Sequence, residues 1–481
     1  MFQKILLSIV LFFAFSIVAF FLLIKVIDFN EYKPRLQKMI KESTGYELMI
    51  KGDITLSLSP VGISVFDIEV MNPHDKEAGS FAKLKSFDVA LEIAPLLQKE
   101  IKIRHITVEA LTLLIEKMNN DHYNFELPVS KTIDAKKIVE QNSSIEKEMA
   151  FPLVNVKKIK FVNANIIYSE NNQSEKFLLE NMNLSMNDIR YDASKHRLQG
   201  LSFLAETTVD KMQYGTYVIS DIGMFVEMKD AVISSDNVSY TLFSTPSQGS
   251  VKIDLSGKQP KISLKSKIEG LKLAHLSKEI WKKELIEGKA SGDVKLSFFL
   301  GDALTFKSTI NGFIQLYGEN VLLKEYDIDK LATALDPSKG LKTILLTPFE
   351  STKGSQTLLK EINTKVDIGY SEIQFSDVAL STSKSRLACK GTLNIVEEKL
   401  KDVRIALLDS KGCAITEQGI TGTLSKPSLK MDEATVETLS NVAFLLLSKS
   451  KSSQKNNPLV RDENCTIFYE GIVKHPENKT N

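Results

Sequence analysis

Alternation of apolar and polar residues with a period of two is the dominant pattern from about residue 46 onward. It is clearest over residues 54–58, 87–93, 101–104, 182–187, 251–255, 262–264 and 294–298. Each of these segments places apolar side chains on one face and polar side chains on the other, which is typical of half-buried antiparallel strands. The pattern therefore predicts a mainly β protein built on a long, twisted antiparallel sheet with a few short helices.

The alternation changes phase inside some of the predicted strands. Ile101 and Ile103 give way to Ile106 and Val108 around His105, and a second change follows near residues 111–113. A β-bulge produces such a change and bends the strand. The segment 99–116 has no turn signal and is much longer than a usual strand of about 5–6 residues, so we expect it to curl.

Helical spacing of apolar residues is confined to a few segments. We expect helices over 30–43, over 271–287, in pieces over 319–346, and over 433–448. Segments 128–149 and 449–457 have the composition of loose connections.

A run without a charged residue, apolar except for Ser8 and Ser16, spans Ile5 to Ile24 and is bounded by Lys4 and Lys25. About 20 apolar residues match a hydrocarbon core of about 30 Å, so the run predicts a transmembrane helix. A cleaved signal peptide is the alternative. Its apolar region is usually about 7–15 residues and ends at small residues, and we therefore favour a retained anchor. The charges flanking the run do not decide which side of the membrane holds the rest of the chain.

Charge and motif content argue against several function classes. The 481 residues carry 61 Lys and Arg against 60 Asp and Glu, so the net charge of +1 does not favour a nucleic-acid partner. The six histidines are scattered, and we find no GxSxG, HExxH or glycine-rich phosphate-binding motif, so we expect neither an enzyme nor a cofactor or metal. The three cysteines have no CxxC spacing and are compatible with one disulfide and one free thiol.

A series of short motifs near the N-terminus resembles the AsmA family of bacterial envelope proteins. In chain order these are Asp28-Phe29-Asn30, Tyr32-Lys33-Pro34, Thr44 to Leu48, Gly52-Asp53-Ile54, Leu58-Ser59-Pro60 and Phe66 to Asn72. The similarity continues through Ala94 to Leu97, Ile101 to Glu116, Leu285 to Gly292, Asn311-Gly312 and Gly391 to Leu393, and in the tail at Gly412-Cys413, Gly422 to Leu424, Pro427, Cys465 and Phe468 to Gly471. It is weakest between about residues 128 and 250. The chain departs from the family pattern at Ala110, where a proline is frequent, and at residues 120–125.

The resemblance implies a single-pass inner-membrane protein of the cell envelope, with the N-terminus in the cytoplasm and the body in the periplasm. We expect an anchor over 1–27, an N-terminal segment of one short helix and strands over 28–127, and a loose linker over 128–150. The sheet would continue over 151–429, and a helix with a cysteine-containing tail would occupy 430–481. An oxidising compartment would allow a Cys413–Cys465 disulfide, contributing about 3–4 kcal/mol and leaving Cys389 free, although other pairings stay open.

The apolar strand faces exceed what the few helices can cover, so either the sheet packs on itself or it forms a groove that holds acyl chains. Packing is usual for β proteins, whereas the resemblance favours a groove. The expected lining is Ile63, Val65, Phe87, Val89, Ile101, Ile103, Val251, Ile253, Ile262, Leu264, Leu296 and Phe298.

The expected function is to hold or transfer phospholipid or another envelope lipid in support of outer-membrane lipid homeostasis. The alternative is a scaffold that carries no lipid and assists assembly of outer-membrane proteins. Lys278, Lys282 and Lys283 surround the single tryptophan, Trp281, and allow a contact with lipid headgroups. A solvated helix face with Trp281 packed on the sheet is the interpretation that we favour.

Overall fold

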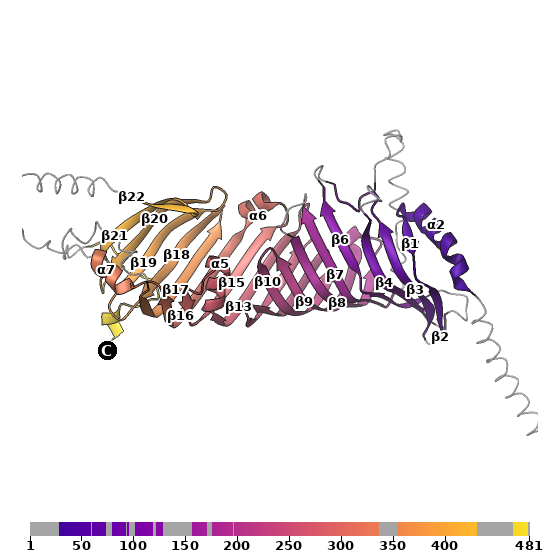
Figure 1. Cartoon of the computed structure of the whole chain (residues 1–481), viewed down its shortest axis with the longest axis horizontal. Helices are drawn as coiled ribbons and strands as arrows, with labels where there is room; N and C mark the ends of the chain where they lie inside the picture. The colour runs from indigo at the N-terminus through magenta and orange to yellow at the C-terminus, as the bar shows by residue number, and fades with distance from the viewer. Residues whose placement is uncertain are drawn as a thin grey trace, which may run out of the picture. The chain divides into compact units, whose positions relative to one another are not determined.

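The computed structural model describes residues 28–58, 60–73, 79–92, 94–95, 102–118, 122–127, 156–170, 176–195, 197–335, 354–430 and 465–479. The predicted anchor over 5–24, the linker over 128–150 and the helix over 433–448 lie outside these residues. The chain forms two compact units, residues 1–231 and residues 232–481, which we call unit 1 and unit 2. Both are dominated by long strands, as the alternation predicted (Figure 1).

Unit 1 begins with a 3-10 turn, η1 (Phe29–Tyr32), and one helix, α2 (Lys33–Thr44), which matches the predicted helix over 30–43. The Asp28 carboxylate caps η1 by accepting a hydrogen bond from the Asn30 amide, and Gly45 ends α2 with a φ of 80°. The strands are β1 (Leu48–Ile50), β2 (Ile54–Leu58), β3 (Val61–Met71), β4 (Ser80–Leu91), β5 (Ile103–Glu109), β6 (Thr112–Lys117), β7 (Lys158–Glu170), β8 (Lys176–Tyr191), β9 (Leu201–Tyr214) and β10 (Tyr217–Lys229), with η3 (Arg197–Gly200) before β9.

The prediction of a wholly antiparallel sheet was wrong at one place. Both β5 and β6 pair with β7 in the parallel direction, whereas the other pairings within unit 1 are antiparallel. Parallel neighbours need a connection of a dozen or more residues, and about 40 residues separate Lys117 from Lys158. The alternation was read correctly, but it does not encode strand direction.

The predicted long strand over 99–116 is divided into β5 and β6. The division falls at Ala110, whose φ is 50°. The register also shifts by one residue between the Ala90–His105 and Leu91–Ile103 pairs, at the position where the sequence changes phase. The bulge interpretation is therefore confirmed at His105.

Left-handed residues recur inside several strands of unit 1. Asp67, Asn163, Asn181 and Asp221 have φ values of 49°, 53°, 53° and 52° within β3, β7, β8 and β10. Asn and Asp tolerate this conformation better than other residues that carry a Cβ. In β3, Val65 and Ile68 are buried in the same cluster, although they are an odd number of residues apart. The left-handed residue thus switches the alternation and keeps the apolar side chains on one face.

Unit 2 continues with β11 (Val232–Leu242), β12 (Thr245–Asp254), β13 (Lys261–Lys272), β14 (Ile286–Glu287), β15 (Lys289–Phe299), β16 (Asn311–Lys324), β17 (Gln356–Gly369), β18 (Glu372–Ser381), β19 (Arg386–Asn394), β20 (Lys399–Leu408), β21 (Ala414–Thr423) and β22 (Lys426–Lys430). The pairings from β11 to β22 are antiparallel, and β14 pairs beside β15 on β16.

Short helices lie between the strands of unit 2, and not all were predicted correctly. Among the described residues they are α5 (Leu273–Trp281), α6 (Ala303–Thr309) and α7 (Ile328–Leu335), and a 3-10 turn, η7 (Pro476–Lys479), follows the last strand. The helix expected over 271–287 ends at Trp281, and residues 319–324 form the end of β16 instead of a helix. Helix α6 was not predicted, because seven residues are too few to show a helical period.

The C-terminal residues 465–475 cross the sheet of unit 2, and we call them the strap. Phe468, Tyr469 and Val473 pack in a buried cluster with alanines of β18, β19 and β20. Ala379, Ala388 and Ala406 are register partners on these strands, so their small side chains leave room for the strap. The strap therefore covers one face at one end of unit 2.

Candidate functional site

Two continuous rows of side chains, all apolar except Thr207, cross seven strands of unit 1 on one face, because directly paired residues share a face. The first row is Ile63, Val89, Ile106, Ile159, Met186, Ala205 and Val226, and the second is Val65, Phe87, Val108, Phe161, Leu184, Thr207 and Met224. We call this surface the apolar face of unit 1.

The apolar face of unit 1 is only partly covered. Most members of the two rows are half-buried, and 44% of the surface of Ile63 is exposed to solvent. The fully buried members are Val65, Val108, Ala205 and Thr207. Central core residues of a two-layer protein are normally buried on every side. Within the described residues, this face lacks a complete second layer.

The opposite face of the same strands is polar. The row one residue away contains Ser64, Asp88, Thr107, Lys160, Ser185 and Glu206, and it ends at Phe225. Phe225 is the exception, with 69% of its surface exposed. The contrast between the faces shows that apolar surface is concentrated on one side.

Unit 2 has the same arrangement. A row with one glycine crosses eight strands through Val251, Leu264, Leu296, Gly312, Ile368, Ile373, Leu393 and Leu400, and a parallel row begins with Ile253, Ile262 and Phe298. All six residues of unit 2 that the sequence singled out are half-buried. Lys252, Lys265 and Lys295 alternate with them and are exposed.

The residues predicted to line a groove thus fall on one face within each unit. Ile63, Val65, Phe87, Val89 and Ile103 share the face of unit 1, and the remaining predicted residues share that of unit 2. Ile101 lies outside the described residues. Sequence reasoning missed the contributions of β7 to β10, such as Phe161 and Met224, because their place in the rows depends on pairing register.

Aromatic residues form one end of the apolar face of unit 1. Tyr168, Phe177, Tyr214 and Tyr217 are consecutive register partners on β7 to β10. The Tyr168 hydroxyl donates to the Glu170 carboxylate at 2.5 Å, and burial together with this carboxylate raises the pKa of Tyr168. Tyr214 and Tyr217 are more than half exposed. Such rings have an apolar body and a polar tip, which suits a boundary between apolar surface and water.

Helices α5 and α6 lie at opposite strand ends of the apolar face of unit 2. Leu273 of α5 packs in a buried cluster with Ala290, Val321 and Leu359. Phe306 of α6 meets Phe298 edge to face, with ring centroids 5.0 Å apart. Trp281, at the end of α5, is 52% exposed, so the interpretation that it packs on the sheet was wrong.

Cys389 lies on the apolar face of unit 2, between its register partners Val378 and Ile405. Burial raises the pKa of its thiol to about 11. Cys413 and Cys465 form a disulfide with Cα atoms 6.1 Å apart, and Cys389 is free.

Polar contacts hold the strap to the face of the unit 2 sheet that lies opposite the apolar face. The Tyr469 hydroxyl donates to Asp377 Oδ1 at 2.6 Å, and burial raises the pKa of Tyr469. The Arg386 guanidinium donates to the carbonyls of Asp409 at 2.8 Å and Val473 at 3.3 Å, and it lies 5.7 Å from the Tyr469 ring centroid. Burial lowers the pKa of Arg386. These contacts are structural and lie away from the apolar face.

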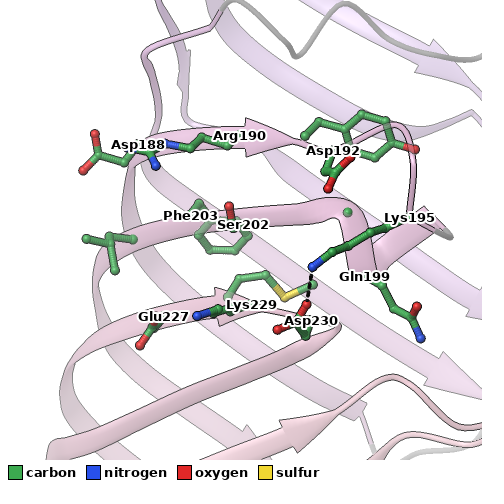
Figure 2. A pocket seen from close by; sticks show the side chains of 14 residues that line it. Asp188, Arg190, Asp192, Lys195, Gln199, Ser202, Phe203, Glu227, Lys229 and Asp230 are labelled. Atoms are coloured by element: carbon green, nitrogen blue, oxygen red, sulfur yellow. Dashed lines mark hydrogen bonds and ion pairs between the residues drawn. The ribbon is translucent and has the colours of Figure 1, made fainter.

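A separate polar cavity of about 510 Å³ lies in unit 1 between η3 and the ends of β8 to β10 (Figure 2). Both carboxylates and cationic side chains line it, and Lys195 Nζ is 2.8 Å from Asp230 Oδ1. Their hydrogen bond lowers the pKa of Asp230 and raises that of Lys195. The cavity contains none of the residues of the two apolar rows.

Among the described residues, none of the helices has the length and apolar character needed to cross a membrane. The same part of the chain contains no group of three or more His, Cys, Asp or Glu side chains placed to hold a metal ion.

Comparison with known proteins gives one family match. Residues 1–202 match the model of the AsmA family, which covers η1, α2 and β1 to β8. No curated protein matches the chain.

Proposed function

This chain belongs to the AsmA family through its first 202 residues, and from this premise we propose that it holds or transfers envelope lipid on the apolar faces of its sheet. The lipid would be a phospholipid or another diacyl lipid, held without covalent chemistry. The predicted N-terminal anchor would retain the protein at the inner membrane, with its body in the periplasm.

The observation that carries the proposal is the half-buried state of the apolar rows in both units. Val251, Ile253 and Leu264 each have an apolar register partner between β12 and β13, yet they keep solvent contact. Each CH₂ group moved from water onto such a surface gains about 0.8 kcal/mol. An acyl chain spanning several strands would therefore bind without a dedicated headgroup site, and selectivity for the headgroup would be low.

Charges placed on the apolar face test the proposal. We expect the double variant Ile253→Asp, Leu264→Asp of the full chain to lose bound lipid, because two carboxylates in the acyl path add a large desolvation cost. The measurement is lipid per protein after purification, by native mass spectrometry and solvent extraction. Circular dichroism checks that the variant is folded.

The matched control is Lys252→Asp, Lys265→Asp, which places the same carboxylates one residue away on the opposite face. This variant is expected to retain lipid as the native chain does. Equal lipid content in the native chain and both variants would contradict the proposal, because the apolar face would then not be the binding surface.

The alternative function is a scaffold that assists outer-membrane protein assembly. Leu204 and Phe225 favour it, since they lie on the polar face of the neighbouring strands β9 and β10 with 51% and 69% exposure. A contiguous exposed apolar patch is typical of a contact with another protein, and on this alternative these two side chains would belong to such a contact. A scaffold of this kind would purify without lipid, and Phe225→Ser would reduce partner binding.

A further inference from the structure

The end of α5 presents an apolar tip to solvent. Ile280 and Trp281 are 51% and 52% exposed, whereas Leu273 and Ser277, earlier in the same helix, are buried against the sheet. The helix ends at Trp281, and the next residue, Lys282, has a φ of 58° that stops further helical turns. The helix is therefore anchored at its start and leaves its last two apolar side chains unburied.

Three lysines lie within three residues of Trp281 in the sequence. The side chains of Lys278, Lys282 and Lys283 are 64%, 65% and 65% exposed. Their nearest carboxylates, on Glu284, Glu279 and Glu325, are 3.6, 3.9 and 3.8 Å away and less exposed, at 49%, 39% and 48%. The ammonium groups are thus the more accessible charges around Trp281.

An exposed tryptophan and isoleucine flanked in sequence by accessible lysines match the chemistry of a bilayer interface. Indole rings favour the headgroup level, apolar side chains enter the acyl boundary, and lysines reach phosphates while their stems stay apolar. Loose, solvent-exposed ion pairs of this kind contribute little to folding and can exchange a carboxylate for a phosphate.

We propose that the end of α5 is a membrane-contact element, which inserts Ile280 and Trp281 into the interface of a bilayer containing anionic phospholipid. Because α5 packs at one end of the apolar face of unit 2, this contact would place that face next to a bilayer surface. The inference does not depend on lipid being held by the apolar face.

Trp281 is the single tryptophan of the chain, so its fluorescence reports the contact directly. The experiment uses the full chain in vesicles of phosphatidylethanolamine and phosphatidylglycerol with brominated acyl chains. We expect bromine to quench Trp281, a blue shift of its emission, and protection from acrylamide.

Variants assign the quenching to the tip. Ile280→Ser, and the triple variant Lys278→Glu, Lys282→Glu, Lys283→Glu, should each reduce bromine quenching and restore acrylamide access. Leu304→Ser on α6 is the matched control, since Leu304 is 59% exposed at the opposite strand end, and it should leave the quenching unchanged.

A native Trp281 that stays accessible to acrylamide and is not quenched by brominated lipid would overturn the proposal. The variant Ile253→Asp, Leu264→Asp separates the two proposals. If it loses bound lipid but keeps Trp281 quenching, the quenching comes from the bilayer and not from lipid on the apolar face. If quenching disappears with the bound lipid, the membrane-contact proposal fails.

Discussion

At the residue scale, the Asn and Asp residues in the left-handed conformation hold the apolar side chains on one face. Asn181 has a φ of 53°, and its side-chain amide donates to Asp210 at 3.0 Å. We expect Asn181→Ala to be less stable than Asn181→Gly by about 1 kcal/mol, because only glycine adopts this φ without strain. Both variants lose the amide, so the comparison isolates the backbone. Equal free energies of unfolding from denaturant titration would show that the left-handed residue carries no strain.

Cys389 gives a second residue-scale prediction. Since the thiolate is the reactive species and the pKa is raised to about 11, alkylation near pH 8 should be about a hundredfold slower than that of an exposed thiol. The rate should climb as the pH rises towards 11. Mass spectrometry of iodoacetamide-treated protein measures it. The variant Cys389→Ser, Lys390→Cys moves the thiol to the other face of the sheet and should be alkylated at the rate of an ordinary exposed thiol. Slow alkylation at both positions would show that burial on the apolar face is not the cause of the slow reaction.

At the scale of elements, the strap is fixed by one covalent link and a few polar contacts at the end of unit 2. The disulfide joins residues 52 apart in sequence, and closing a loop of that length is worth about 4 kcal/mol in the chain-entropy model. We expect Cys465→Ser to raise hydrogen exchange at Phe468 and Val473 while leaving β3 and β4 protected. Cys389→Ser is the control. Unchanged exchange in the strap would mean that its polar contacts alone hold it.

The sequence indicated the elements better than their arrangement. The period-two segments form strands, and the phase change at His105 is a bulge. Strand direction was not visible at β7, because a parallel and an antiparallel strand show the same alternation. Helix α6 lacked a visible period, although Asp302 caps its start by accepting a hydrogen bond from the Thr305 amide at 2.8 Å.

At the scale of the whole molecule, the sequence predicted the type of candidate site, an apolar sheet face, but only some of the residues that form it. Residues such as Ile253 and Leu264 stood out from local alternation. Phe161 and Met224 did not, because their membership of an apolar row depends on which residues face each other across strands. The exposure of Trp281 also depends on how far α5 extends beyond the sheet. Local pattern fixes the face of a side chain, whereas register and packing decide what that face meets.

The central claim is that lipid contacts one face of the sheet and not the other. Met224 and Phe225 are adjacent in β10 and point to opposite faces, so a photo-reactive benzoylphenylalanine at each position of the full chain, in the membranes of the expressing cell, compares the two faces directly. We expect illumination to link lipid to position 224 and not to position 225, as detected by mass spectrometry of the purified chain. Equal linkage at both positions, or none at 224 in a folded protein, would contradict the account.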